Sequence, residues 1–243
     1  MNTINTGDTA WVLISAALVL LMTPGLAFFY GGMVRVKSVL NMMMMSFAAL
    51  AIVPILWVLY GYSMAFGDSA GGVVGKPGDF FGLKGLMSGA AIITPFPDHA
   101  IPALAFVAFQ SAFAVIAVAL ISGAIADRTK FSAWLVFVAI WSTVVYFPVA
   151  HWVFAFNGLA APDGGWIANG IKAIDFAGGT AIHINAGAAG LALALVLGKR
   201  RGFGKDPMRP HNLTLVMLGA GLLWFGWFGF NAGSALGAST LAA

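Results

Sequence analysis

The sequence predicts an all-α membrane protein, a bundle of six transmembrane helices. Only 8% of its 243 residues are charged and 60% are hydrophobic, with a mean hydropathy of +0.94. A soluble domain carries roughly 25% charged residues, because ionic groups must cover its surface. The abundance of apolar and aromatic residues excludes a disordered chain, and the absence of strand-like alternation argues against a membrane barrel.

The six spans are the stretches that contain no Asp, Lys or Arg, in a chain that has no Glu. Each is long enough for the roughly 20 apolar residues that cross a bilayer as a helix. They are Thr9–Val34, Ser38–Gly67, Ala100–Ala126, Phe131–Pro162, Phe176–Gly198 and Asn212–Ala243, with spans expected at about 9–34, 38–67, 100–126, 131–155, 175–198 and 212–236. A shorter apolar patch with two prolines, Gly85–Pro97, is interpreted as an interfacial or re-entrant piece of a long loop.

Positive charge predicts the orientation of these spans. Nine of the 12 basic residues fall in alternate loops, with three in the others. The nine are Arg35, Lys37, Arg128, Lys130, Lys199, Arg200, Arg201, Lys205 and Arg209, and the three are Lys76, Lys84 and Lys172. Cytoplasmic loops carry the excess of Lys and Arg, so both termini are expected outside. The first span has no basic residue before it and is too long for a signal peptide, so we expect it to be retained in a bacterial plasma membrane.

Polar residues inside spans are the first candidates for function, because they are costly in lipid. His183 is expected deep in the fifth span, a little over two helical turns after Asp175. Asp175 is either an ordinary cap of the helix that begins at Phe176 or a residue with a second role. For His183 a proton-carrying role is favoured over a packing role. His151 is interpreted as part of an interfacial aromatic belt, and His99 and His211 as solvated loop residues.

Aromatic residues form two further groups. Phe106, Phe109 and Phe113 recur at helical spacing with Gln110 beside them, and Trp224, Trp227, Phe228 and Phe230 precede Asn231 and Ser234. Such a stripe is usually helix packing or lipid contact; the alternative is a cation–π cage for a small cation.

Several functional classes are disfavoured. The chain has no cysteine and four histidines, and its motifs contain no Ser-His-Asp arrangement or paired intramembrane carboxylates. We therefore expect no enzyme, no metal and no cofactor. The basic residues are too few for nucleic-acid binding and are better explained as loop charges. The basic loop Lys199–Arg209 suits contact with anionic lipid.

The string Asp175–Gly187 (DFAGGTAIHINAG) resembles the signature of the ammonium transporter (Amt/Mep/Rh) family. Six other pieces agree with that family, so the resemblance covers essentially the whole chain. They are Pro24–Gly32, Tyr60–Ser63, Phe109–Gln110, Phe131–Ala133, Gly198–Arg200 and Gly226–Ser234.

The resemblance implies a fold of eleven spans, built as two inverted five-span repeats plus a last helix and assembled as a homotrimer with one pore per subunit. Residues 1–243 would then be the N-terminal portion of an ammonium transporter domain. The partner histidine of His183 belongs to the tenth span of that fold, so this chain is interpreted as a truncated or partial transporter.

The resemblance also implies roles for individual residues. Phe113 and Phe230 correspond to a stacked gate, and Phe109 and Ser234 to the outer site that recruits ammonium. Asp175 corresponds to a buried acid that organises this site. His183 corresponds to the first pore histidine, and Trp227 to a pore-lining residue. Phe154 stands where the family often has tryptophan, and a phenyl face attracts a cation less than an indole does.

The expected function is therefore ammonium or ammonia transport, with cation recruitment outside and a proton relay through His183. The alternatives are an ammonium sensor or scaffold of the same family, or a non-conducting truncated product. A PII-type regulator on the cytoplasmic face is implied by the resemblance alone.

Overall fold

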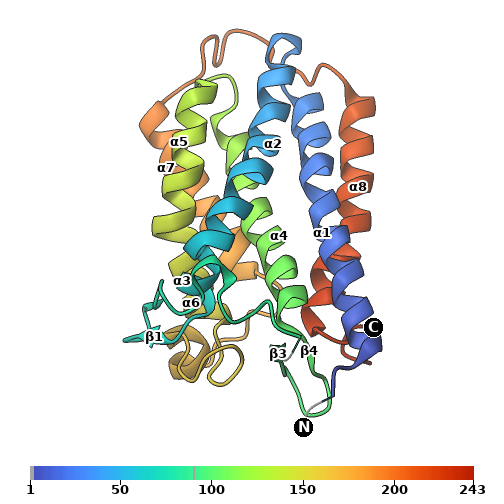
Figure 1. Cartoon of the computed structure of the whole chain (residues 1–243). Coiled ribbons are helices and arrows are strands. Elements are labelled where there is room, and N and C mark those ends of the chain that lie inside the picture. The colour runs from blue at the N-terminus through green and yellow to red at the C-terminus, as the bar shows by residue number, and fades with distance from the viewer. Residues whose placement is uncertain (1–2, 90) are drawn as a thin grey trace.

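The computed structural model describes residues 3–89 and 91–243, in which six long helices stand side by side as one bundle (Figure 1). They are Thr6–Met33 (α1), Val36–Phe66 (with α2, Val39–Leu56, and α3, Tyr62–Phe66), Ala103–Ile125 (with α4, Ala103–Ile121), Phe131–Phe154 (with α5, Phe131–Trp141, and α6, Phe147–Phe154), Gly179–Leu197 (with α7, Asn185–Leu197) and Leu213–Ala235 (with α8, Leu213–Asn231). The predicted all-α fold with six membrane-spanning helices is confirmed.

Both chain ends lie toward one end of the bundle, as six crossings require (Figure 1). We call this the outer end, following the predicted orientation. It carries two short hairpins, β1 (Ser69–Ala70) with β2 (Val74–Gly75) and β3 (Ile92–Ile93) with β4 (Ile101–Pro102). The patch Gly85–Pro97 forms turns and strand β3 there, except for Ala90, which lies outside the described residues. The connections 34–38, 126–130 and 198–212 lie at the other end, which we call the basic end.

Helix α4 forms the centre of the bundle. Fifteen of its 19 residues are buried, because helices pack against it from several sides. Two indole N–H groups help to join the surrounding helices: Trp57 donates to the carbonyl oxygen of Val107 at 3.1 Å, and Trp134 to that of Met45 at 2.8 Å. The core thus lies around α4, on which the predicted Phe106, Phe109 and Phe113 stripe is carried.

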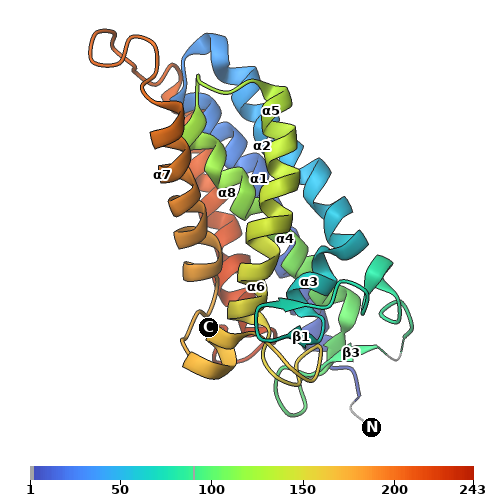
Figure 2. The same ribbon diagram turned by 90° about the vertical axis from the view of Figure 1, so that its left-hand side faces the viewer.

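Helix α7 is packed much less than α4. In α7 only Ala186 and Gly190 are buried, and Leu195 and Val196 are 75% and 82% exposed. Figure 2 shows α7 at the edge of the bundle. A large exposed apolar face in a membrane protein contacts lipid or further protein.

Helices α1 and α8 approach each other closely through glycines. A Cβ atom added to Gly219 would lie 2.6 Å from the carbonyl oxygen of Gly25, and one added to Gly32 would lie 2.6 Å from that of Asn212. Small residues allow such backbone contact between helices in lipid. The glycines of the sixth span therefore let α8 pack tightly against α1.

Gly219→Val is expected to prevent the close approach of α1 and α8, since backbone atoms of α1 cannot move aside as a flexible side chain can. We expect a strongly reduced yield of folded protein and a lower thermal unfolding midpoint in detergent. Gly221→Val is the matched control, because nothing lies within 4 Å of a Cβ at Gly221 on the same helix. Equal stability of the two variants would contradict this packing.

A cluster of charges joins three connections at the basic end. The Asp127 side chain is 3% exposed and accepts hydrogen bonds from Arg35 Nε at 3.1 Å and from the Ser38 hydroxyl. Arg200 lies 3.8 Å from the same carboxylate, and Arg128 donates to the carbonyl oxygen of Gly198. Charges that the sequence marks only as basic loop residues therefore hold the start of α2 and the end of α7 together.

Candidate functional site

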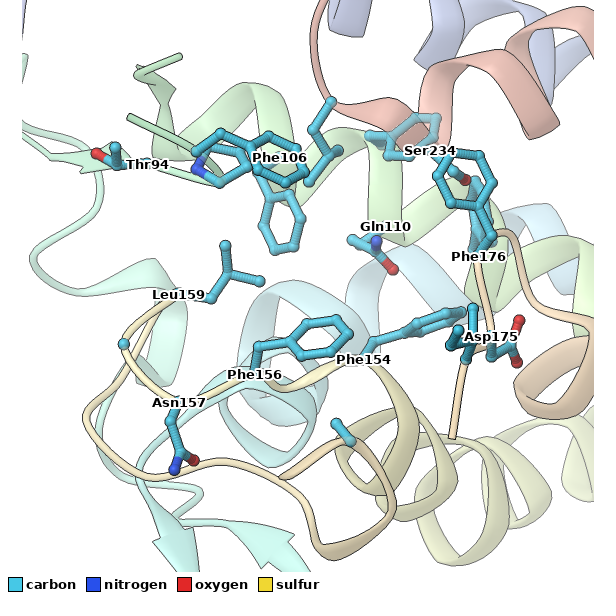
Figure 3. A pocket seen from close by; sticks show the side chains of 18 of the residues that line it. Thr94, Phe106, Gln110, Phe154, Phe156, Asn157, Leu159, Asp175, Phe176 and Ser234 are labelled. Atoms are coloured by element: carbon cyan, nitrogen blue, oxygen red, sulfur yellow. The ribbon is translucent and has the colours of Figure 1, made fainter. Parts of the chain in front are cut away.

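A cavity of about 530 Å³ opens at the outer end of the bundle (Figure 3). Aromatic rings make up much of its wall, together with a few polar side chains. The rings are those of Phe96, Phe106, Phe109, Phe113, Phe154, Phe156 and Phe176, and the polar groups include Gln110, Lys172, Asp175 and Ser234. The structure thus brings together most of the outer-site residues suggested by sequence, from spans far apart in the chain.

Two phenyl rings close the inner side of this cavity. The rings of Phe113 and Phe230 are stacked, with centroids 4.4 Å apart and planes 8° apart, and both side chains are almost fully buried. Phe109 lies against Phe113 at 4.7 Å on the cavity side. A stack this close leaves no room for a solute between the two rings.

His183 lies on the far side of the stacked pair. Its ring is 5.7 Å from Phe230 in an edge-on arrangement and 5.7 Å from Trp227, on which it stacks at 26°. Its Nδ1 is 3.2 Å from the carbonyl oxygen of Gly178. A carbonyl oxygen only accepts, so Nδ1 donates in this contact and Nε2 carries the lone pair, with no hydrogen-bond partner among the described residues.

A second cavity, of about 500 Å³, begins at His183 and extends toward the basic end. Tyr30, Leu120 and Gly187 are among its lining residues. The order along the bundle is therefore outer cavity, phenyl pair, imidazole and inner cavity.

Asp175 closes a tight turn at the start of the fifth span. Its two carboxylate oxygens accept hydrogen bonds from four backbone N–H groups at 2.6–3.0 Å; the donors are Gly178, Gly179, Thr180 and Ala181. In Figure 3 the carboxylate points toward the start of that span rather than into the cavity. These N–H groups and the helix N-terminus stabilise its negative charge.

The expected helix start at Phe176 is therefore wrong. Residues between Asp175 and Gly178 form a turn, Gly178 has φ 102°, and the helix begins at Gly179 with a π-helical segment, Gly179–Ile184. The estimate of two α-helical turns between Asp175 and His183 fails for the same reason. Asp175 is also half-buried in this chain rather than fully buried.

Ser234 and Phe154 both line the outer cavity, although they lie far apart in the sequence. The Ser234 hydroxyl donates to the carbonyl oxygen of Phe230 at 2.8 Å, so its oxygen lone pairs are left to accept from a ligand. The ring of Phe154 is 6.5 Å from that of Phe113. Trp152 does not replace it: its indole N–H donates to Val73, and its ring lies against Trp166.

The three remaining histidines differ from their predicted settings. His151 is fully buried, with its ring nitrogens 2.9 Å from Ser69 Oγ and 3.0 Å from the carbonyl oxygen of Ala65, so it is not part of an exposed belt. His99 and His211 are not simply solvated. His99 Nδ1 is 2.8 Å from a carboxylate oxygen of Asp8, and His211 Nδ1 is 2.9 Å from the carbonyl oxygen of Val34. In each case a distant segment supplies the partner.

Charged groups at the outer end pair with one another beside the cavity. The Lys76 ammonium donates a hydrogen bond to Asp68 at 2.6 Å and holds the pKa of that carboxyl below its usual value, with a further bond from the Asp163 N–H. The Lys76 side chain is exposed and that of Asp68 is partly exposed, so the pair adds little to stability.

Several cavity residues were not singled out as site residues from the sequence, among them Phe156, Lys172 and Phe176. These three lie in or beside the irregular segment that follows α6, where no periodicity indicates which way a side chain points. Within residues 3–89 and 91–243, no group of three His, Asp, Glu or Cys residues could hold a metal ion. Besides the charged Lys172 and Asp175, the outer cavity offers ring faces and the neutral oxygens of Gln110 and Ser234, and ring faces attract a small organic or ammonium-like cation.

Comparisons with known proteins agree with this geometry. The ammonium transporter of Mycobacterium tuberculosis is 64% identical over 97% of this chain and 52% of the relative. The crystal structure of Saccharomyces cerevisiae Mep2 superimposes with a TM-score of 0.83 at 32% identity, covering 98% of this chain and 52% of that one. A structure described as a sensor Amt protein gives a TM-score of 0.82 at 29% identity, over 96% and 56%.

The chain spans about half the length of the curated relatives it matches. The sequence profile of the Ammonium Transporter Family matches residues 10–243, which run from the first part of α1 through α8 to the last residue. With an aromatic cavity, a closed phenyl pair and a histidine in line along six membrane-spanning helices, this multi-pass membrane protein belongs to the ammonium transporter family.

Proposed function

We propose that this protein transports ammonium across the membrane by binding the cation outside and passing neutral ammonia inward. The observation that carries the proposal is the stacked Phe113 and Phe230 pair, which separates an aromatic outer cavity from His183. Ring faces attract a cation, whereas a bare cation is expensive to move through an apolar constriction.

The proton supplies the selectivity in this proposal. Ammonium can lose a proton and pass the phenyl pair as a neutral molecule, but potassium cannot lose its charge. In this proposal the proton that ammonium loses is accepted by Nε2 of His183 on the inner side of the pair, so that the proton and ammonia cross separately. Phe109, Phe154 and Ser234 would hold the cation outside, while Asp175 would shape the site through its hydrogen bonds to the backbone.

Reconstitution tests this function directly. The full-length gene product in proteoliposomes is expected to give saturable methylammonium uptake that excess potassium does not inhibit. Potassium competing as strongly as ammonium would contradict the proposed loss of the proton. No uptake and no current with any ammonium gradient would overturn transport itself.

A sensor function is the second candidate, because the chain is also similar to a structure described as a sensor Amt protein. A sensor would bind ammonium in the outer cavity without net flux. Binding followed by intrinsic tryptophan fluorescence, together with flux measurements on the same preparation, separates the two functions.

Family membership further supports a homotrimer and a PII-type regulator docked at the basic end. Mass measurement in detergent tests the first, and co-purification with a PII-type protein tests the second.

A further inference from the structure

The amide of Gln110 is an unusual group for its position in α4. Ser111 is the only other polar residue among the 19 of this helix. Gln110 is 7% exposed, and within the described part of the chain its Oε1 is fully buried without a hydrogen-bond partner. Figure 3 shows the amide among the side chains that line the outer cavity.

An unpaired buried acceptor carries the full cost of losing water. An apolar side chain of similar shape would avoid this cost, and α4 uses apolar residues almost throughout. Because buried polar groups in native proteins are nearly always paired, an acceptor left unpaired at the wall of a cavity indicates that a ligand supplies the donor.

The aromatic part of the cavity wall does not distinguish cations by whether they carry N–H donors. The faces of Phe109, Phe113 and Phe154 attract any cation of suitable size, whether or not it carries N–H groups. Phenyl faces also attract cations less strongly than indole faces do. Ser234 Oγ has already donated its proton to Phe230 and can only accept. Neutral acceptors beside these rings, Ser234 Oγ and a second one, would therefore decide which cations bind.

We propose that Gln110 Oε1 accepts a hydrogen bond from the cation in the outer cavity, so that this site selects cations with N–H donors. Ammonium and methylammonium would use Gln110 and Ser234 as acceptors, whereas a quaternary ammonium ion would bind through the rings alone. This inference rests on the proposed function, since it assumes that the outer cavity binds ammonium.

The test measures binding rather than flux, using the purified full-length gene product and titration calorimetry. The probes are methylammonium, which has three N–H donors, and tetramethylammonium, which has none. Gln110→Met keeps the length of the side chain but removes the amide. It is expected to weaken methylammonium binding about tenfold while leaving tetramethylammonium binding unchanged.

Two further variants separate this effect from a general loss of structure. Gln110→Glu retains an acceptor and is expected to restore methylammonium binding. Ser111→Ala removes the neighbouring hydroxyl, which does not line the cavity, and is expected to bind both probes as the unmodified protein does.

The outcomes distinguish this inference from the proposed function. If the unmodified protein binds methylammonium but Gln110→Met weakens both probes equally, or neither, the role of Gln110 is overturned and ammonium binding stands. If the unmodified protein binds no methylammonium and shows no flux, the inference and the proposed function both fail.

Discussion

Replacing His183 with alanine is expected to lower methylammonium uptake by about 100-fold, the scale of a lost acid–base group. The imidazole lies directly behind the stacked pair, 5.7 Å from Phe230, with Nδ1 directed at the carbonyl oxygen of Gly178 and Nε2 free. Without it, a proton released at the phenyl pair has no acceptor in that position. Uptake by the full-length protein in proteoliposomes measures the loss.

Two controls separate proton transfer from packing. His183→Asn can still donate to Gly178 but cannot take up a proton near neutral pH, so it is expected to be as inactive as His183→Ala. His211→Ala is expected to transport normally, because His211 contacts Val34 at the basic end, away from both cavities. Unchanged uptake and unchanged exclusion of potassium in both His183 variants would remove this residue from the mechanism.

Asp127→Asn is expected to destabilise the protein by about 2 kcal/mol, because it removes the charge that pairs two arginines. Asparagine tolerates the left-handed backbone at this position, where φ is 62°, so the variant isolates the charge. The partners Arg35 and Arg200 are 29% and 33% exposed. Water can therefore hydrate the two guanidinium groups in part. We expect the loss of stability to be smaller than the loss for a fully buried ion pair that is deprived of one partner.

Thermal unfolding in detergent should show this loss as a drop of about 5 °C in the midpoint. Asp206→Asn is the control, since Asp206 is an exposed acid in the same set of connections. Arg35→Ala combined with Asp127→Asn should cost less than the sum of the two single changes, because they remove one interaction. Strict additivity would show that the charge cluster does not hold these segments together.

The number of spans could be predicted because a single strong effect decides it. Hydrocarbon does not accept Asp, Lys or Arg without a large cost, so the charge-free stretches coincide with helices. The stripe containing Phe109 and Phe113 was also visible, because helical spacing places residues three and four apart on one face. Both inferences depend only on neighbours in sequence.

The turn at Asp175 and the partners of the histidines could not be predicted in this way. Asp175 binds four N–H groups only because Gly178 adopts a positive φ, which a glycine permits but does not require. His99 contacts Asp8, which is 91 residues away in the sequence, and His151 contacts Ser69, which is 82 residues away. Such contacts depend on how whole helices pack, which local patterns do not encode.

The stack of Phe113 on Phe230 also has a kinetic consequence. Under the proposed function, a molecule that crosses from the outer cavity would have to wait until one of these two buried rings rotates out of the stack. The crossing rate then follows the frequency of a side-chain rotation, which neighbouring atoms must accommodate, rather than the speed of diffusion. The transport rate would therefore rise steeply with temperature, as a rate limited by a protein motion does. Diffusion through an open, water-filled pore depends on temperature much less.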